Sequence, residues 1–366
     1  MKSPLSQGFN PLGFLKAFAK DRSVLGIDVG AASLKIIQIR KDREQAVLET
    51  YGELSTAAYT GGEAGRATLL ADEKVSEMIV DLRREAGATA TRGIISIPLR
   101  YSFITTIDMP ELNDQQLAEA IQFEARRYIP IPLSDVVVDW WRIPAGEGDN
   151  SHTIKILLAA VQKDVVEKYN RILSQAKIES LGFEIEVFSA ARILSSRMRG
   201  ATLLFDIGAL STKISIVNQG VVQAVHHVDR ASQAFSLAIS QSLGVDFKRA
   251  EQVKHDVGIS NRPEAAGVRH TITPLLDSIF DEADRVRTTF RRRTGLPIDH
   301  AVLVGGGSLM PGLVDYAVEK LGIEVLLSNP FGQLVYPAFL QPTLKGIAPS
   351  FSVATGLTLR ALGAMD

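Results

Sequence analysis

Two copies of one short acidic motif are the residues of this sequence best suited to chemistry. The run Val24–Gly30 (VLGIDVG) returns past the middle of the chain as Leu203–Ala209 (LLFDIGA). Each copy is an apolar strand ending in Asp-x-Gly, followed by a small-residue turn and a second apolar strand. A glycine lets the backbone turn tightly and approach a ligand, because it has no Cβ. The carboxylates of Asp28 and Asp206 stand at the hairpin tips, where a hydrated cation could be held. Two such hairpins indicate a grip on one polyphosphate from opposite sides.

A third glycine-rich segment strengthens this interpretation. Residues 301–308 form an apolar strand that enters Gly305-Gly306-Gly307-Ser308, and residues 309–313 open a helix. Three glycines permit close approach to a flat or anionic group, and a helix start offers N–H donors. Each segment alone is more often a simple turn. Together, in this order, they resemble the phosphate 1, phosphate 2 and adenosine motifs of the actin-like ATPase superfamily, which includes actin, Hsp70 chaperones, sugar kinases and the division protein FtsA.

Length and composition fit a globular protein of more than one domain. The chain has 366 residues, of which 46% are hydrophobic and 22% charged, and this length suits two or more domains. The net charge of −1 gives no electrostatic reason to expect nucleic acid. The absence of cysteine excludes disulfides and thiolate-bound metals. No uncharged run approaches the ~20 residues of a membrane helix. We therefore expect a soluble, cytoplasmic protein.

The expected elements divide the chain into two lobes and an insert. The resemblance implies an α/β fold of the actin-like, ribonuclease H-like type, with two lobes around a nucleotide cleft. We assign residues 23–98 plus 178–199 to the first lobe, 99–177 to a small α+β subdomain of the FtsA type inserted in it, and 200–366 to the second lobe. Within the insert, Asn113 or Asp114 is expected to cap a helix that runs to Tyr128. Residues 1–22 form a tail that docks on its own domain, stays mobile or contacts a membrane surface.

The insert narrows the resemblance within the superfamily. Its entry Met109-Pro110, its helix ending in Glu124-x-x-x-Tyr128-Ile-Pro-x-Pro132 and its strand Val136-x-x-Asp139 are similar to the PilM family of type IV pilus proteins. The C-terminal runs 329–331 and 348–360 match that family's ending as well. The similarity covers nearly everything from about Val24 to Leu362.

This resemblance implies that ATP with Mg²⁺ lies between the lobes. Asp28 and Asp206 would hold the hydrated metal, while Gly30 and Gly208 present backbone N–H groups to the phosphates. Lys35 would be a phosphate-binding cation, with a solvated strand residue as the alternative. The other expected nucleotide contacts are Ala31, Ser33, Ser211, Thr212, Gly305, Gly306, Gly307 and Ser308.

Two further roles are implied by the family pattern. In the segment Glu282-Ala-Asp-Arg285, Glu282 would reach the ribose hydroxyls and Arg285 would stack on adenine, unless both simply serve a solvent-facing helix. Glu186 corresponds to the acidic residue of the family's Glu-Pro-Phe segment and would orient a water on the γ-phosphate. Here Val187 replaces the proline, which changes the expected geometry.

The expected function is that of an ATP-binding assembly protein and at most a slow ATPase. Ala31, Ala32, Ala209 and Leu210 stand where many relatives carry hydroxyls, which predicts weak binding or slow turnover. By resemblance, the insert binds the cytoplasmic N-terminal peptide of PilN, a bitopic inner-membrane protein, within residues 99–177. The chain would then be held at the inner membrane through this partner, with other pilus platform proteins and self-association as further contacts.

Three alternatives stay open at this point. One is an FtsA-like or GspL-like scaffold of cell division or type II secretion. Another is a small-molecule kinase, for which residues 55–100 offer no general-base aspartate segment. The third is a nucleotide-binding-deficient relative, because Ala31 and Ala32 remove hydroxyl contacts.

Overall fold

The computed structural model describes residues 23–143, 153–194 and 200–363. The tail expected over residues 1–22 lies outside these residues. Within them, no helix is long and apolar enough to cross a membrane.

The first lobe is built on a five-stranded sheet in the order β3-β2-β1-β4-β8. Strands β1, β2 and β3 are antiparallel, whereas β1, β4 and β8 are parallel. Their bounds are β1 (Ser23–Val29), β2 (Ser33–Asp42), β3 (Gln45–Ser55), β4 (Arg92–Ile97) and β8 (Glu179–Ile185). The short helix α2 (Ala57–Thr60) follows β3. Strand β4 is buried along its whole length, and β1 and β2 are buried along most of theirs, as expected for inner strands of a sheet covered on both sides, whereas the edge strand β3 is mostly half-buried or exposed.

The second lobe repeats this topology. Its sheet has the order β11-β10-β9-β12-β13, with antiparallel pairing from β9 to β11 and parallel pairing from β9 to β13. The strands are β9 (Ala201–Ile207), β10 (Thr212–Asn218), β11 (Val221–Val228), β12 (Ile298–Val304) and β13 (Glu324–Leu327). The sequence motif that occurs twice is therefore one part of a duplicated strand arrangement.

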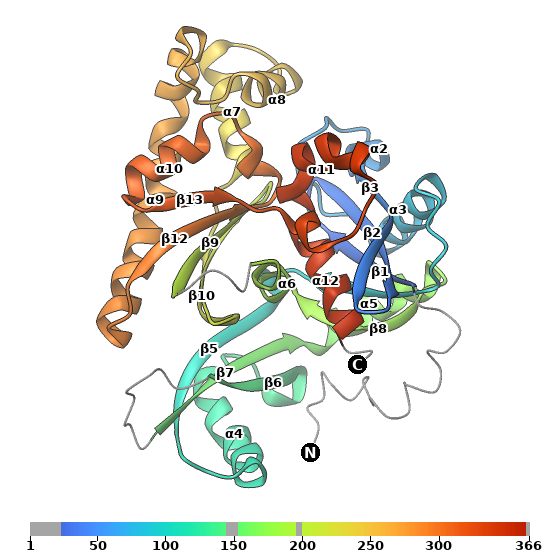
Figure 1. Cartoon of the computed structure of the whole chain (residues 1–366), viewed down its shortest axis with the longest axis vertical. Helices are drawn as coiled ribbons and strands as arrows, with labels where there is room; N and C mark the ends of the chain where they lie inside the picture. Colours follow the sequence, from blue (N-terminus) through green and yellow to red (C-terminus); the bar gives the residue numbers. More distant parts are fainter. Residues whose placement is uncertain (1–22, 144–152, 195–199, 364–366) are drawn as a thin grey trace.

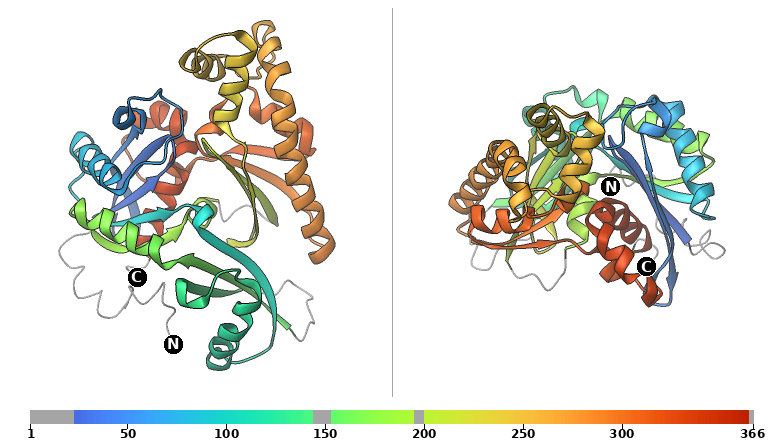
Figure 2. Two further views of the ribbon diagram at one scale, coloured as in Figure 1. Left: turned by 180° about the vertical axis from the view of Figure 1, so that it is seen from behind. Right: turned by 90° about the horizontal axis from the view of Figure 1, so that it is seen from above.

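Helices cover the sheets and place the two lobes side by side (Figure 1). On the second lobe these are α7 (Ser232–Leu243), α8 (Phe247–Asp256), α9 (Ala266–Thr294) and α10 (Leu313–Leu321). On the first lobe, α3 (Asp72–Glu85) and α5 (Lys163–Gln175) cover one face, while α6 (Glu186–Arg192) and α12 (Ser352–Gly363) cover the other. The short helix α11 (Gln341–Ile347) precedes α12. The view from above shows α12 and its neighbours between the two sheets (Figure 2).

The C-terminal segment packs on the first lobe, although it follows the second lobe in the chain. Phe331, Phe351 and Leu357 share one core with Val24 and Ile94 of the first sheet. This differs from the sequence-based assignment of residues 200–366 to the second lobe. That assignment followed the order of the segments along the chain, which does not say which sheet a helix covers.

The insert is a three-stranded antiparallel sheet with one covering helix. The strand order is β5-β7-β6, formed by β5 (Ser102–Pro110), β6 (Val136–Ile143) and β7 (Thr153–Gln162). Helix α4 (Asp114–Tyr128) begins as expected, because the Asn113 side chain accepts a hydrogen bond from the N–H of Gln116 in a capping box. Helix α5, which the sequence analysis placed in the insert, packs its apolar face into the first-lobe core instead.

Candidate functional site

The two Asp-x-Gly hairpins have the same local geometry. The N–H of Gly30 donates to the carbonyl of Ser33 at 3.0 Å, and the N–H of Gly208 donates to the carbonyl of Ser211 at 3.1 Å. These N–H groups close their own turns, so they are not the phosphate donors that the sequence analysis expected. Donors to an anion would have to come from other residues of each turn.

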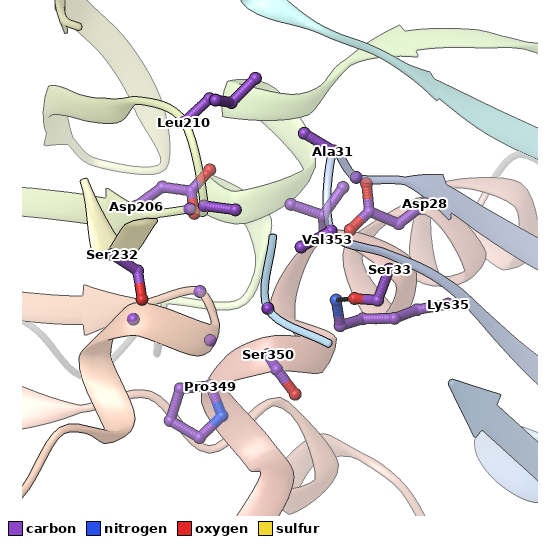
Figure 3. A pocket seen from close by; sticks show the side chains of 18 of the residues that line it. Asp28, Ala31, Ser33, Lys35, Asp206, Leu210, Ser232, Pro349, Ser350 and Val353 are labelled. Carbon is purple, nitrogen blue, oxygen red and sulfur yellow. Dashed lines mark hydrogen bonds between the residues drawn. The ribbon is translucent and has the colours of Figure 1, made fainter. Parts of the chain in front are cut away.

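Both hairpins open onto one cavity of about 610 Å³ between the lobes. In Figure 3, Asp28, Ser33 and Lys35 lie on one side of it, with Asp206 and Leu210 on the other. The expected site residues that line this cavity are Asp28, Gly30, Ala31, Ser33, Lys35, Glu186, Asp206, Gly208, Ser211, Gly305, Gly306 and Gly307. The fold thus brings together segments that are far apart in the sequence.

The third glycine segment lies directly against the second hairpin. Gly305 has a φ of +83°, and a Cβ on it would be 2.5 Å from the carbonyl oxygen of Ile207 and 2.6 Å from Oδ1 of Asp206. Only glycine allows both this backbone conformation and this approach. By contrast, a Cβ on Gly306 would meet nothing within 4 Å. The segment therefore provides an open cavity wall beside the second carboxylate.

On the first-lobe side, a buried carboxylate lies near an ammonium. Asp28 Oδ1 accepts a hydrogen bond from Ser96 Oγ at 2.9 Å. Burial raises the pKa of Asp28 to about 6, and the charge of Lys35 offsets part of that rise. Lys35 Nζ donates to Ser33 Oγ at 2.7 Å and lies 3.2 Å from Glu53 Oε1. Since Lys35 is only 8% exposed and lines the cavity, it is not a solvated strand residue.

On the second-lobe side, one lysine joins two carboxylates. Lys213 Nζ lies 3.2 Å from Asp206 Oδ2 and 2.9 Å from Glu186 Oε2. Burial alone would lower the pKa of Lys213, but the two carboxylates raise it above its ordinary value. Glu186 Oε1 also accepts the N–H of Leu99 at 2.8 Å. Each oxygen of Glu186 therefore already accepts one hydrogen bond, and the two donors fix the orientation of the carboxylate that was expected to orient a water.

Four expected contacts lie away from the cavity. The buried hydroxyl of Thr212 donates to the carbonyl of Arg230, and Ser308 Oγ donates to the carbonyl of Gly305. Glu282 and Arg285 pair with each other on α9, where Glu282 also contacts His226. None of these four is among the cavity-lining residues.

A second Glu-x-x-basic pair, which the sequence analysis missed, does line the cavity. Glu251 and Lys254 lie on α8, with Lys254 Nζ 2.7 Å from Glu251 Oε2 and 2.6 Å from Ser232 Oγ. Burial lowers the pKa of Lys254. The sequence signal was present, because Glu251-Gln-Val-Lys254 has the same spacing as Glu282-Ala-Asp-Arg285. The two patterns differ only in their place in the fold, because α8 packs against α7 and places its pair at the cavity.

A loop of the first lobe reaches across to the second. The N–H of Ala67 donates to Gln233 Oε1 of α7 at 2.6 Å, and Glu63 Oε1 accepts the N–H of Lys248 of α8 at 3.3 Å. A Cβ on Gly65 would lie 2.7 Å from Glu251 Oε1. Residues 63–67 therefore form a strap between the lobes beside the cavity.

Helix α6 connects the cavity to the insert. Its first residue, Glu186, lines the cavity, and the ring of Phe188 lies 5.4 Å from that of Trp141 on β6. A second contact joins Thr106 Oγ1 of β5 to the carbonyl of Gln223 on β11 at 3.1 Å. Helix α6 therefore carries a cavity-lining residue and a residue in contact with the insert, two positions apart.

The site fits a nucleotide better than it fits a two-aspartate metal site. The cavity has glycine walls, ammonium groups from both lobes and room for a ligand of this size. For Mg²⁺, Asp28 lines the cavity and accepts one hydrogen bond from Ser96, whereas Asp206 is paired with Lys213. Across the three described ranges, no group of three or more metal-ligating side chains could hold an ion directly.

Two sheets of equal topology, with paired Asp-x-Gly hairpins facing one cleft, define an actin-like ATPase fold, and solved structures agree. EutJ from Carboxydothermus hydrogenoformans matches with a TM-score of 0.55 at 15% identity, covering 98% of this chain and 99% of that one. MreB5 of Spiroplasma citri bound to ADP matches with a TM-score of 0.54 at 12% identity, covering 94% and 97%.

Sequence and structure also identify the family. The model of the family described as type IV pilus assembly protein PilM matches residues 26–362, and this chain therefore belongs to the PilM family. A chain of a PilM-PilN type IV pilus biogenesis complex matches with a TM-score of 0.78 at 25% identity, covering 93% of this chain and 98% of that one. The cell division protein FtsA of Streptococcus pneumoniae is 22% identical over 359 residues, covering 85% of this chain and 76% of that protein.

Proposed function

We propose that this chain binds ATP in the cleft between its lobes and holds a peptide of a PilN-type membrane protein on its insert. It would serve as a nucleotide-dependent assembly component of a type IV pilus platform, positioned at the inner membrane through that partner. The observation that carries the proposal is the convergence of both Asp-x-Gly hairpins and the glycine segment on one cavity.

The nucleotide part rests on the chemistry of the lining residues. Lys35 and Lys213 place positive charge on opposite sides of the cavity, where they would bind phosphate oxygens. The glycine segment would face the nucleoside, and Glu251 with Lys254 would border it from α8. A solved structure of the same fold is described as bound to ADP. Asp28 is the residue that would hold a hydrated Mg²⁺, which would supply further charge neutralisation.

Hydrolysis would be slow at most. Glu186 is the expected water-orienting residue, but Lys213 and the N–H of Leu99 already occupy its two oxygens. These two donors hold the carboxylate in one orientation, which leaves it little freedom to position a water. The main effect of the nucleotide would therefore be to change lobe closure on binding, and ATP hydrolysis would contribute little.

The partner part rests on the family and on the position of the insert. The relative in the PilM-PilN complex assembles with PilN. In this chain, α6 links the cavity to β6 of the insert through Phe188 and Trp141. If nucleotide changes the position of α6, the two ligands are coupled, and each changes the affinity of the other by the same factor.

A steric block of the cavity tests the nucleotide part. Gly306 lines the cavity, and a Cβ on it would meet nothing within 4 Å, so Gly306→Phe adds a bulky side chain at the cavity wall without a clash at its first atom. We expect at least a tenfold loss of ATP affinity by isothermal titration, with an unchanged melting temperature. The matched control is Gly267→Phe on α9, which is equally open but lies outside the cavity. Equal affinities for wild type, variant and control would refute the site.

The coupling has a built-in reporter, because both tryptophans of the chain, Trp140 and Trp141, lie on β6 of the insert. ATP binding in the cleft is expected to change tryptophan emission, and Phe188→Leu is expected to reduce that change while leaving ATP affinity within about twofold. A peptide with the cytoplasmic N-terminal sequence of a PilN-type protein should bind with an affinity that differs between ATP-loaded and nucleotide-free protein. An emission spectrum that ATP leaves unchanged, together with one peptide affinity in both states, would contradict the coupling.

A further inference from the structure

The internal repeat is longer than the Asp-x-Gly motif and ends in a lysine in both copies. Asp28-Val-Gly-Ala-Ala-Ser-Leu-Lys35 matches Asp206-Ile-Gly-Ala-Leu-Ser-Thr-Lys213 at Asp, Gly, Ala, Ser and Lys. The strand registers agree as well, since Asp28 lies opposite Lys35 and Asp206 opposite Lys213. Each lobe therefore contributes one ammonium beside its own hairpin carboxylate.

The second of these lysines lies between two carboxylates. Lys213, Asp206 and Glu186 have side chains that are only 9–12% exposed, and the Nζ of Lys213 is within 3.2 Å of both acids. A Cβ on Gly208 would be 3.7 Å from this Nζ, so the ammonium lies directly beside the turn of the second hairpin. This is the place where a metal ion bound to Asp206 would otherwise supply positive charge.

We infer that Lys213 is the phosphate-binding cation of the second lobe and replaces Mg²⁺ at Asp206, so that nucleotide binds this chain with little dependence on Mg²⁺. The inference rests on the proposed nucleotide site and goes beyond it by assigning the charge of the second hairpin to the protein itself.

The physical argument is one of charge and donor number. An ammonium has three N–H donors; Asp206 and Glu186 take two, and the third is available to a phosphate oxygen in the cavity. Without Lys213, two buried carboxylates would face an anionic ligand, and their repulsion in a low-dielectric site would be strong. A divalent cation would then be needed to bring phosphate close. With Lys213 present, the net charge of the three groups falls from −2 to −1, so less positive charge from a divalent cation is needed.

The test measures ATP and ADP affinity by isothermal titration with excess Mg²⁺ and with EDTA. For wild type, we expect the nucleotide affinities measured with Mg²⁺ and with EDTA to differ by less than about fivefold. For Lys213→Gln, we expect a modest loss with Mg²⁺ and a loss of at least tenfold more in EDTA, which is the scale of one charged hydrogen bond. Lys35→Gln, the matched position in the first lobe, should weaken binding by the same factor in both conditions. Lys163→Gln, an exposed lysine outside the cavity, should change nothing.

Each outcome decides the inference. Wild-type affinity that falls more than tenfold in EDTA overturns it while leaving the nucleotide site intact. The inference is also overturned if the ratio of the affinities in Mg²⁺ and in EDTA is the same for Lys213→Gln as for wild type. An absence of nucleotide binding in both conditions overturns the inference and the proposed function together. If Lys213→Gln does not fold, the wild-type ratio still decides, and Lys213→Arg, which keeps the charge, should retain the independence from Mg²⁺.

Discussion

Replacing Gly356 by alanine is expected to separate helices α6 and α12 and to destabilise the protein. Gly356 lies on α12 where that helix crosses α6, and a Cβ on it would be 2.0 Å from the carbonyl oxygen of Ser189. Ordinary van der Waals contact begins at 3.4 Å, so the helices would have to move apart by about 1.4 Å, the difference between these distances. The opposing atom belongs to the backbone and cannot rotate away.

The size of the effect follows from two opposing contributions. Alanine favours a helix over glycine by about 1 kcal/mol, whereas overpacking costs about 1–3 kcal/mol. Movement of α6 is also resisted by Glu184, which lies 2.5 Å from Arg192 of α6 and 3.2 Å from Arg360 of α12. Because the clash is with backbone and ion pairs hold both helices in place, we take the upper cost. The free energy of unfolding is then expected to fall by about 2 kcal/mol. For a chain of 366 residues, that loss corresponds to a fall in melting temperature of about 3 °C.

Differential scanning calorimetry measures the melting temperature of Gly356→Ala against that of wild type. Gly363→Ala is the matched control, because it lies on the same helix and its Cβ would meet nothing within 4 Å. The control is expected to melt at or slightly above the wild-type temperature. If Gly356→Ala melts as high as this control, the close crossing of α6 and α12 is not present in solution.

Three further predictions concern the cavity. In the folded state Asp28 has a pKa of about 6, against its ordinary value of 3.8. The folded state therefore holds the proton more tightly, and stability falls as the pH rises from about 4 to 6. Asp28→Asn should reduce the difference in unfolding free energy between pH 4.5 and pH 7, measured in urea, by about 1–3 kcal/mol, and an unchanged difference would contradict the burial of this carboxyl. Gln233→Ala removes the acceptor for Ala67 in the strap between the lobes and should speed nucleotide release severalfold in stopped-flow measurements, whereas an unaltered rate would show that the strap does not close the cavity. Glu251→Gln should lower ATP affinity in a titration, whereas Glu282→Gln should not. If only Glu282→Gln lowers the affinity, Glu282 of α9 contacts the nucleotide as the sequence analysis expected.

The sequence predicted the two hairpins because each is a local pattern. It predicted that they face one ligand because the pattern occurs twice. An apolar strand ending in Asp-x-Gly, present twice, requires little tertiary information. Asn113 as a helix cap is equally local and is confirmed. The fold class and the family followed from the combination of such motifs, and the matches to the PilM family confirm both.

The rest depended on packing between distant segments. Glu251 and Glu282 begin indistinguishable Glu-x-x-basic patterns, and only the position of α8 beside the cavity separates them. The role of Lys213 depends on Glu186, which arrives from the first lobe. The same limit applies to α5 and α12, because the place of a segment in the chain does not say which sheet it covers.

The return of α12 to the first sheet has a consequence for synthesis. The face of that sheet formed by Val24, Ile37 and Ile94 shares its core with Ala354 and Leu357 of α12. At about 5–20 residues per second, a ribosome makes α12 on the order of tens of seconds after β4. During that interval the sheet made first exposes an apolar face that nothing nearer in sequence covers completely. We therefore expect the nascent first lobe to keep an aggregation-prone apolar surface until one of the last helices of the chain emerges.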